Sequence, residues 1–196
     1  MTLLIKYKNW QGDTMIEQIK KCERCGLCCN QKPLLDQEKH SEIFWVGLSA
    51  KKVCSDSEGP LSPHTNTGML IKTIEETIGD TVTYKTNLVK CLPLNDTKKL
   101  RYPNKKEIDC CIENLDYEIK QLSPKIVFLL GEKVSHSVER HLDIEFDKWD
   151  GFNYCYKKIS GVYYVPIHHP SYIYVYKRKN IESYINSIKN LVSSLL

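Results

Sequence analysis

Short apolar runs alternate along this chain with segments of helical periodicity, and this alternation restricts the folds it can adopt. Four runs rich in β-branched and aromatic residues predict buried strands at 42–47, 82–89, 125–131 and 162–169. Helical spacing of apolar residues runs from Met69 to Ile78, from Ile108 to Leu122 and from Ile181 to Leu195. The pattern predicts an α/β fold, a three-layer α/β/α sandwich around a central, mostly parallel sheet of four to five strands.

Length and composition suit one domain. The chain has 196 residues, of which 41% are hydrophobic and 27% charged, and a net charge of +4 that permits nucleic acid as a partner without demanding it. We expect a single domain over 1–196, with 1–21 forming an N-terminal extension and helix. The apolar run before Lys6 is too short for a secretory or membrane-spanning segment. We therefore expect a cytoplasmic monomer that contacts no membrane.

The cysteines are the most unusual part of the composition. There are nine, and four of them fall within "CERCGLCC" at 22–29. In a reducing compartment, clustered cysteines are more often metal ligands or redox groups than disulfides, and an odd count also argues against a complete disulfide framework. A tetrahedral zinc site or an iron–sulfur cluster fits four thiolates drawn from three segments, and ligand type does not separate the two. The first choice of ligands is Cys22, Cys25, Cys91 and Cys110, with Cys28, Cys29 and Cys111 as alternatives.

Polar residues gather where the predicted strands end. In a parallel sheet, ligands bind beyond the carboxyl ends of the strands. The second strand ends in "TNLVKC", which places Asn87 and Cys91 at its tip, and the fourth ends in "HHPSY". A long polar loop follows the first strand. Each feature alone fits an ordinary turn, but together they predict a site at this edge of the sheet.

The order of these motifs resembles the iron–sulfur branch of the uracil-DNA glycosylase superfamily. The matching stretches are "CERCGLC", "FWVGLSA", "GPLSPHTNTGMLI", "YKTNLVKCLP", "SPKIVFLLGEKV" and "IHHPSY", spread over about residues 22–190. The resemblance implies a [4Fe-4S] cluster on Cys22, Cys25, Cys91 and Cys110. It also implies a DNA glycosylase that flips a pyrimidine nucleotide from single- or double-stranded DNA and hydrolyses its N-glycosidic bond to leave an abasic site.

The resemblance also assigns roles to individual residues. His169 matches the histidine that donates to the O2 oxygen of the leaving base, and Asn87 matches the asparagine that reads the base edge. His168, as the neighbour of His169 on a strand, is expected to face the other way. The residues implied to surround the base are Gly47, Leu48, Ser49 and Leu61. Those implied to contact DNA are Ser62, His64, Ser171, Tyr172, Ile173, Lys177, Arg178 and Lys179, with Tyr172 and Ile173 as candidates for an apolar wedge.

Departures from the family pattern leave alternatives open. Leu48 stands where one branch has a carboxylate that helps activate water, and Leu61 stands where a phenylalanine packs against uracil. Asp56 or Glu58 could supply a displaced carboxylate, and a larger modified pyrimidine could replace uracil as the substrate. Two other classes remain: a catalytically inactive relative that binds DNA or a protein partner, and a zinc-stabilised α/β hydrolase or nucleotide-binding protein.

Overall fold

A five-stranded sheet forms the centre of the molecule in a computed structural model that describes residues 13–53, 55 and 58–196. The strands are β1 (Ile43–Ser49), β2 (Thr83–Val89), β3 (Ile126–Leu130), β4 (Lys157–Ile159) and β5 (Val162–Ile167), in the spatial order β2-β1-β3-β5-β4. All neighbours pair in parallel except β4, which is antiparallel to β5. The four predicted strands are therefore confirmed, and β4 is an added edge strand.

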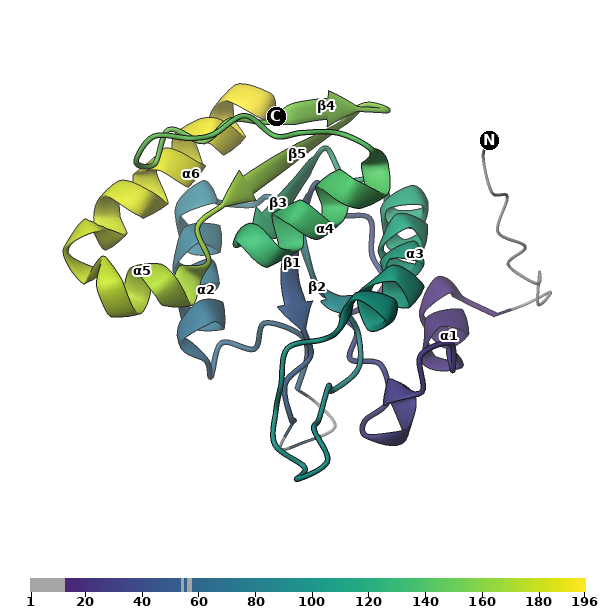
Figure 1. Ribbon diagram of the computed structural model, residues 1–196. Helices are drawn as coiled ribbons and strands as arrows, with labels where there is room; N and C mark the ends of the chain where they lie inside the picture. The colour runs from purple at the N-terminus through teal and green to yellow at the C-terminus, as the bar shows by residue number, and fades with distance from the viewer. Residues whose placement is uncertain (1–12, 54, 56–57) are drawn as a thin grey trace.

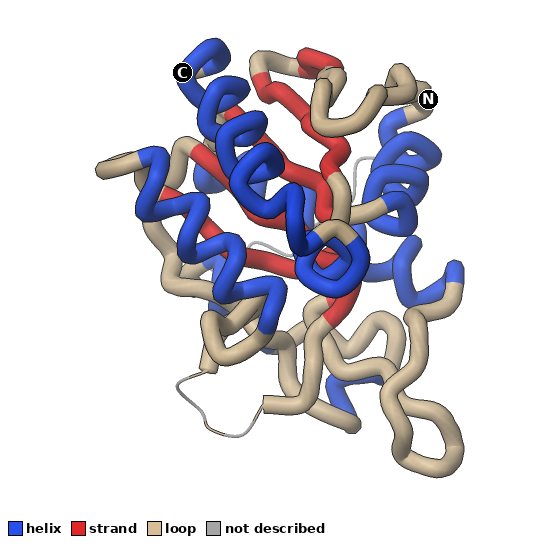
Figure 2. Tube along the Cα trace, turned by 90° about the vertical axis from the view of Figure 1, so that its left-hand side faces the viewer, coloured by secondary structure: helices blue, strands red, loops and turns tan. Residues whose placement is uncertain are grey.

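Helices cover both faces of the sheet (Figure 1). One face packs against α1 (Met15–Lys20), α3 (Lys105–Leu122) and α4 (Glu132–Leu142), and the other against α2 (Asn66–Ile78), α5 (Pro170–Tyr176) and α6 (Ile181–Leu195). Two 3₁₀ turns, η1 (Leu27–Cys29) and η2 (Arg178–Asn180), complete the elements of the described residues. Figure 2 shows the α2, α5 and α6 layer in front of the strands. The predicted three-layer α/β/α sandwich is confirmed.

Local sequence signals explain where the helices begin. Asn104 caps α3 as predicted: its side chain accepts from the backbone N–H of Glu107, and the Glu107 carboxylate accepts from the Asn104 N–H. Thr65 caps α2 by accepting from the N–H of Gly68. Helices α4 and α5 were not predicted, because each is short and follows its strand after one or two residues. No helix within the described residues has both the length and the apolar composition needed to cross a membrane.

Parallel pairing decides where the site lies. The carboxyl ends of β1, β2, β3 and β5 open at the same edge of the sheet, and the register places Gly47 of β1 beside Asn87 of β2. The loops that leave these four strand ends therefore border one common space.

Candidate active site

A cleft of ≈ 1330 Å³ opens at the carboxyl edge of the sheet. It lies where the sequence predicted the site, and segments that are far apart in the chain meet there. The predicted site residues that line it are Gly47, Leu48, Ser49, Leu61, Ser62, Asn87, His169, Ser171 and Tyr172. The structure therefore brings together both predicted catalytic residues and all four predicted base-binding residues.

Asn87 lines this cleft from near the end of β2. Only 3% of its surface is exposed, and within the described part of the chain no hydrogen bond joins its side-chain amide to another residue. A Cβ added to Gly47 would lie 2.5 Å from the Oδ1 of Asn87, so the glycine is what leaves room for this amide. A buried amide without a protein partner keeps one donor and one acceptor available for a ligand.

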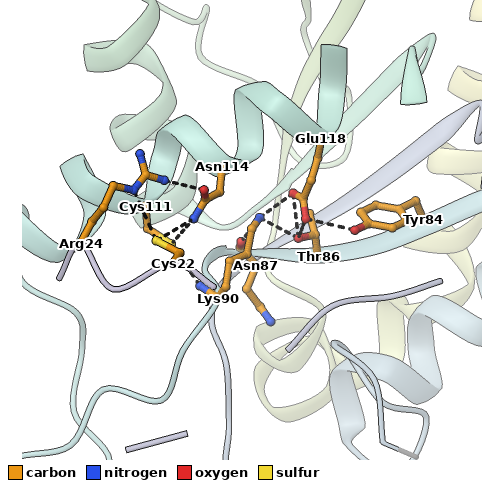
Figure 3. A network of polar contacts seen from close by, with 9 residues as sticks. All are labelled: Cys22, Arg24, Tyr84, Thr86, Asn87, Lys90, Cys111, Asn114 and Glu118. Atoms are coloured by element: carbon orange, nitrogen blue, oxygen red, sulfur yellow. Dashed lines mark hydrogen bonds and ion pairs between the residues drawn. The ribbon is translucent and has the colours of Figure 1, made fainter. Parts of the chain in front are cut away.

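A buried ion pair lies beneath Asn87 (Figure 3). The side chains of Lys90 and Glu118 are 0% exposed, and the Lys90 Nζ lies 2.5 Å from the Glu118 carboxylate. The same ammonium donates to the Asn87 carbonyl oxygen at 2.7 Å and to the Thr86 Oγ1 at 2.8 Å. Burial raises the pKa of Glu118, while the positive charge of Lys90 opposes this rise.

Further hydrogen bonds complete this network. Tyr84 donates its hydroxyl to Glu118 at 3.0 Å, and Thr86 donates to the same carboxylate at 3.0 Å. Because each charge has several partners, the pair is held in one geometry. The carbonyl of Asn87 is one of those partners, so the network fixes the backbone from which the Asn87 amide projects.

His169 reaches the cleft from the other side, after β5. It is the N-cap of α5, and its Nδ1 accepts from the backbone N–H of Ser171 at 3.2 Å. The Ser171 hydroxyl lies 2.7 Å from the same nitrogen. Since a backbone N–H can only donate, Nδ1 carries no proton in this arrangement and the proton of the neutral ring is on Nε2.

The environment of His169 favours this neutral ring. Burial lowers the pKa of His169, and the positive charge of Lys51 lowers it further. Gly131, which ends β3 with φ +90°, allows the close approach, since a Cβ there would lie 3.1 Å from the His169 Cβ. His169 therefore presents an Nε2–H donor near neutral pH.

His168 is also among the residues that line the cleft, but its ring packs against aromatic residues, including Tyr172 of the covering helix α5, as expected for a side chain directed toward the core or a helix. The strand itself ends at Ile167, before this pair. The ring of His168 is held by aromatic residues: its Nδ1 lies 2.8 Å from the Tyr154 hydroxyl, and it stacks on Tyr172 with the centroids 5.7 Å apart. Trp149 and Phe152 pack edge-on against it.

The loop after β1 contributes the rest of the wall. Leu61 has φ 51° and packs beside Gly47, where a Cβ would lie 2.9 Å from its Cδ2. Ser62 is buried, and its carbonyl accepts from Thr65, whereas His64 is exposed and is not among the residues that line the cleft. Glu58 lines the cleft, and Asp56 lies outside the described residues.

The predicted DNA-binding residues after His169 divide into two groups. Tyr172 is 40% exposed, and the side chains of Lys177, Arg178 and Lys179 are exposed at the end of α5 and in η2. Ile173 is 0% exposed and packs in the core with α2 and α6. The prediction that Ile173 is a wedge is wrong, because the segment folds into a helix that turns this side chain inward.

Cysteines from three segments converge beside the buried pair. Cys91 and Cys111 are buried together with Leu27 and Val89, and Cys25 and Cys28 pack against them. Cys22 is joined to Cys111 through Asn114, whose Nδ2 lies 3.8 Å from one Sγ and 3.7 Å from the other. The Lys90 backbone N–H donates to the Cys111 Sγ at 3.4 Å, and the Arg24 Nε donates to the Cys22 Sγ at 3.3 Å.

One of the four predicted ligands, Cys110, does not face the other cysteines. Cys110 lies on the outer side of α3, in a shallow depression with Arg24, Lys105 and Glu113, while its neighbour Cys111 faces the other cysteines. Adjacent helical residues point about 100° apart, so only one of the two can face the group. Within the described ranges, no three Cys, His, Asp or Glu side chains are arranged to hold a single metal ion.

Comparison with known proteins identifies the family of this chain. The sequence model of one protein family, the Uracil DNA glycosylase superfamily, matches residues 36–192 of this chain. The chain belongs to this superfamily. It is similar to the type-4 uracil-DNA glycosylase of Sulfurisphaera tokodaii, with 29% identity over 164 residues, which are 79% of this chain and 72% of that protein.

A solved structure shows the same fold. Wild-type SMUG2 of Pedobacter heparinus superposes with a TM-score of 0.50 and 15% identity, over 81% of this chain and 77% of that one. Membership of the uracil-DNA glycosylase superfamily supports a DNA glycosylase, a hydrolase of DNA repair with DNA as its substrate.

Sequence reasoning missed several residues of this glycosylase-family site. Lys90 and Glu118 were overlooked because a lysine after an apolar run is normally solvated, and its partner is far away on α3. Trp149, Phe152 and Tyr154 surround His168 but come from an irregular segment with no motif. For Cys111 a signal was available, because it stands next to the predicted ligand Cys110 and was one of the alternatives.

Proposed function

We propose that this superfamily member excises a pyrimidine base, uracil or a larger modified pyrimidine, after its nucleotide has rotated into the cleft. Family membership and the type-4 relative support uracil-DNA glycosylase activity. One observation carries the assignment: the unpartnered amide of Asn87 and the ring of His169, whose Nε2 bears the proton, line the same cleft from two strand ends.

The reaction needs stabilisation of the leaving group. The bond between N1 of the base and C1′ of the sugar breaks, and its electron pair moves onto the base, where charge collects at O2. Water then adds to C1′ and loses a proton, and the base anion gains a proton, which leaves a neutral free base and an abasic site. A donor aimed at that O2 contributes about 3 kcal/mol, and the Nε2–H of His169 is suited to this role.

Asn87 is suited to choosing the base. Its amide offers one donor and one acceptor, which match the polar edge of a flipped pyrimidine. The network of Lys90 and Glu118 fixes the backbone behind this amide, and Gly47 leaves it room. Leu61 forms the neighbouring wall with a side chain smaller than an aromatic ring, and this supports a pocket that also accepts larger pyrimidines.

A panel of oligonucleotides, each with one uracil or modified pyrimidine, tests this function through the yield of abasic product. We expect excision of at least one pyrimidine by the native protein. Asn87→Asp replaces the amide donor by a second acceptor and should change the order of preference among the bases as well as the rate. No abasic product from any base, with DNA binding retained, would contradict the proposal and favour a catalytically inactive relative.

We also propose that Cys22, Cys25, Cys91 and Cys111 hold a [4Fe-4S] cluster. The donor set suits one: four sulfurs come from three segments, and N–H groups of Arg24, Asn114 and Lys90 point at the sulfurs of Cys22 and Cys111. Each cysteine of such a cluster binds a different iron, so the four sulfurs need not meet at one point. Once bound, the cluster supplies a cross-link between the N-terminal segment, β2 and α3.

Two adjacent cysteines provide a matched test of this cluster. Cys111→Ser should give protein with little iron and no visible absorption after anaerobic purification, whereas Cys110→Ser should keep the brown colour and the iron of the native protein. Loss of iron in Cys110→Ser with retention in Cys111→Ser would overturn the ligand assignment. Colourless native protein with stoichiometric zinc would overturn the cluster itself.

A further inference from the structure

The residues expected to wedge into a duplex are already engaged within the protein. Tyr172 stacks on His168 with an interplanar angle of 12°, Ile173 is 0% exposed, and Ser171, which precedes these two candidates, bonds to the Nδ1 of His169. A glycosylase that opens a duplex inserts a side chain into the base stack to replace the nucleotide it removes. Here, such an insertion would require these residues to leave the contacts that hold His169 and α5.

The outer face of α5 instead presents aromatic rings. Tyr172 is 40% exposed and Tyr176 is 73% exposed, and their ring centroids lie 5.4 Å apart. With His168 they form a continuous row that starts in the cleft and ends at the surface of the helix. Exposed tyrosines one helical turn apart offer faces on which bases can stack.

Positive charge continues this row. Lys177, Arg178 and Lys179 follow Tyr176 directly, and all three are exposed. The guanidinium of Arg178 lies 5.6 Å from the centre of the ring of Tyr174, a tyrosine of α5 outside this row. Aromatic faces for bases beside cations for phosphates are the usual composition of surfaces that bind single-stranded nucleic acid without reading its sequence.

We propose that the protein acts on unpaired DNA, and that Tyr172, Tyr176 and the cations at 177–179 bind the nucleotides next to the target base. This inference rests on the proposed glycosylase function and adds the strandedness of its substrate. In a duplex, neighbouring base pairs cover both faces of each base, so the exposed tyrosine rings have no base face to contact. In a single strand those faces are free, and the target nucleotide leaves the stack at a lower cost.

Binding of the full-length protein to two matched probes tests the inference. The first is a fluorescently labelled oligothymidine with one central deoxyuridine, and the second is the same strand annealed to its complement with blunt ends. We expect tighter binding to the single strand. Tyr176→Leu should weaken single-strand binding about tenfold, while duplex binding changes less than about twofold.

Tyr156→Leu is the matched control. Tyr156 is 43% exposed and packs on Tyr163 beside β4, so its replacement should leave both affinities unchanged. Thermal unfolding of each variant checks that the fold is intact. Equal losses on both probes, no loss on either, or tighter binding of the duplex by the native protein would overturn the inference.

The abasic-product assay on the same probes separates this inference from the proposed function. Excision that is equally fast from both probes and insensitive to Tyr176→Leu would refute the single-strand surface while the glycosylase function stands. A selective loss of single-strand binding in Tyr176→Leu, without abasic product from these probes or from any base of the oligonucleotide panel, would support the surface and refute the function.

Discussion

The carboxyl ends of β2 and β5 each bring one side chain to the cleft, but the two are held in different ways. Asn87 is supported by a buried ion pair, since the side chains of Lys90 and Glu118 are 0% exposed. The Lys90 ammonium donates to the Asn87 carbonyl and to the hydroxyl of the neighbouring Thr86. His169 is held by a local turn, in which the N–H and hydroxyl of Ser171 meet its Nδ1. The β2 end depends on a partner distant in the sequence, because Lys90 is itself paired with Glu118 on α3, whereas the contacts that hold His169 come from two residues away.

This difference follows from what each residue is proposed to do. An amide that chooses among bases must keep its position when different bases enter, and a buried network with several partners resists displacement. A donor to a leaving group needs the right tautomer more than a rigid surrounding, and one backbone N–H is enough to set it. Substitutions around Asn87 should therefore mainly lower the free energy of unfolding. Substitutions around His169 should mainly change the excision rate or its pH dependence.

The largest effect is expected from Lys90→Met. Removing one partner leaves the Glu118 carboxylate buried without its counter-charge, which costs about 3–5 kcal/mol of unfolding free energy. Chemical denaturation measures this loss. The double variant Lys90→Met with Glu118→Leu removes both charges and should recover much of it. A single variant as stable as the native protein would show that the β2 end is not held by this ion pair.

A smaller effect is expected from Lys51→Met, which acts on the β5 end. Burial lowers the pKa of His169 and the charge of Lys51 adds to this, so removing Lys51 should raise that pKa toward its ordinary value. Protonation of the ring puts a proton on Nδ1, which can then no longer accept from the Ser171 N–H that holds the ring, so excision should be constant above about pH 6.5 and fall as the pH decreases through the pKa of His169. In Lys51→Met this fall should begin at a higher pH. An unchanged pH–rate profile would contradict the electrostatic contact.

The free energy of unfolding of the native protein should also decrease as the pH falls. Because the pKa of His169 is lowered in the folded state, the unfolded chain binds the proton more readily. The stabilisation by the neutral ring is therefore present above the unfolded pKa of about 6.5 and is lost as the pH falls through the folded pKa. Denaturation at several pH values measures this contribution, which Lys51→Met should reduce.

The sequence predicted the layers of the fold and the edge at which the site lies, because strand and helix periodicities are local and parallel strands share one carboxyl edge. It could not choose between Cys110 and Cys111, since the spacing is nearly the same and only the rotation of α3 decides which one faces Cys91. Lys90 and Glu118 were missed for a related reason: their burial depends on packing between β2 and α3.

Ile173 shows a different kind of limit. The resemblance made it a candidate for an apolar wedge, yet Pro170 at the first helical position and the capping ring of His169 begin a helix there. The helix then turns Ile173 into the core, where it packs with α2 and α6. The resemblance supplied a role for the position, whereas the local chemistry of the chain determined its conformation.

Single-turnover excision by His169→Ala and His168→Ala, measured side by side, tests the central claim most directly. The account predicts that His169→Ala slows excision by roughly 100-fold with DNA affinity nearly unchanged, because the donor to the leaving base is removed. His168→Ala removes a ring that packs against Tyr154 and Tyr172 and should slow excision far less. Loss of excision in His168→Ala with a native rate in His169→Ala would contradict the account.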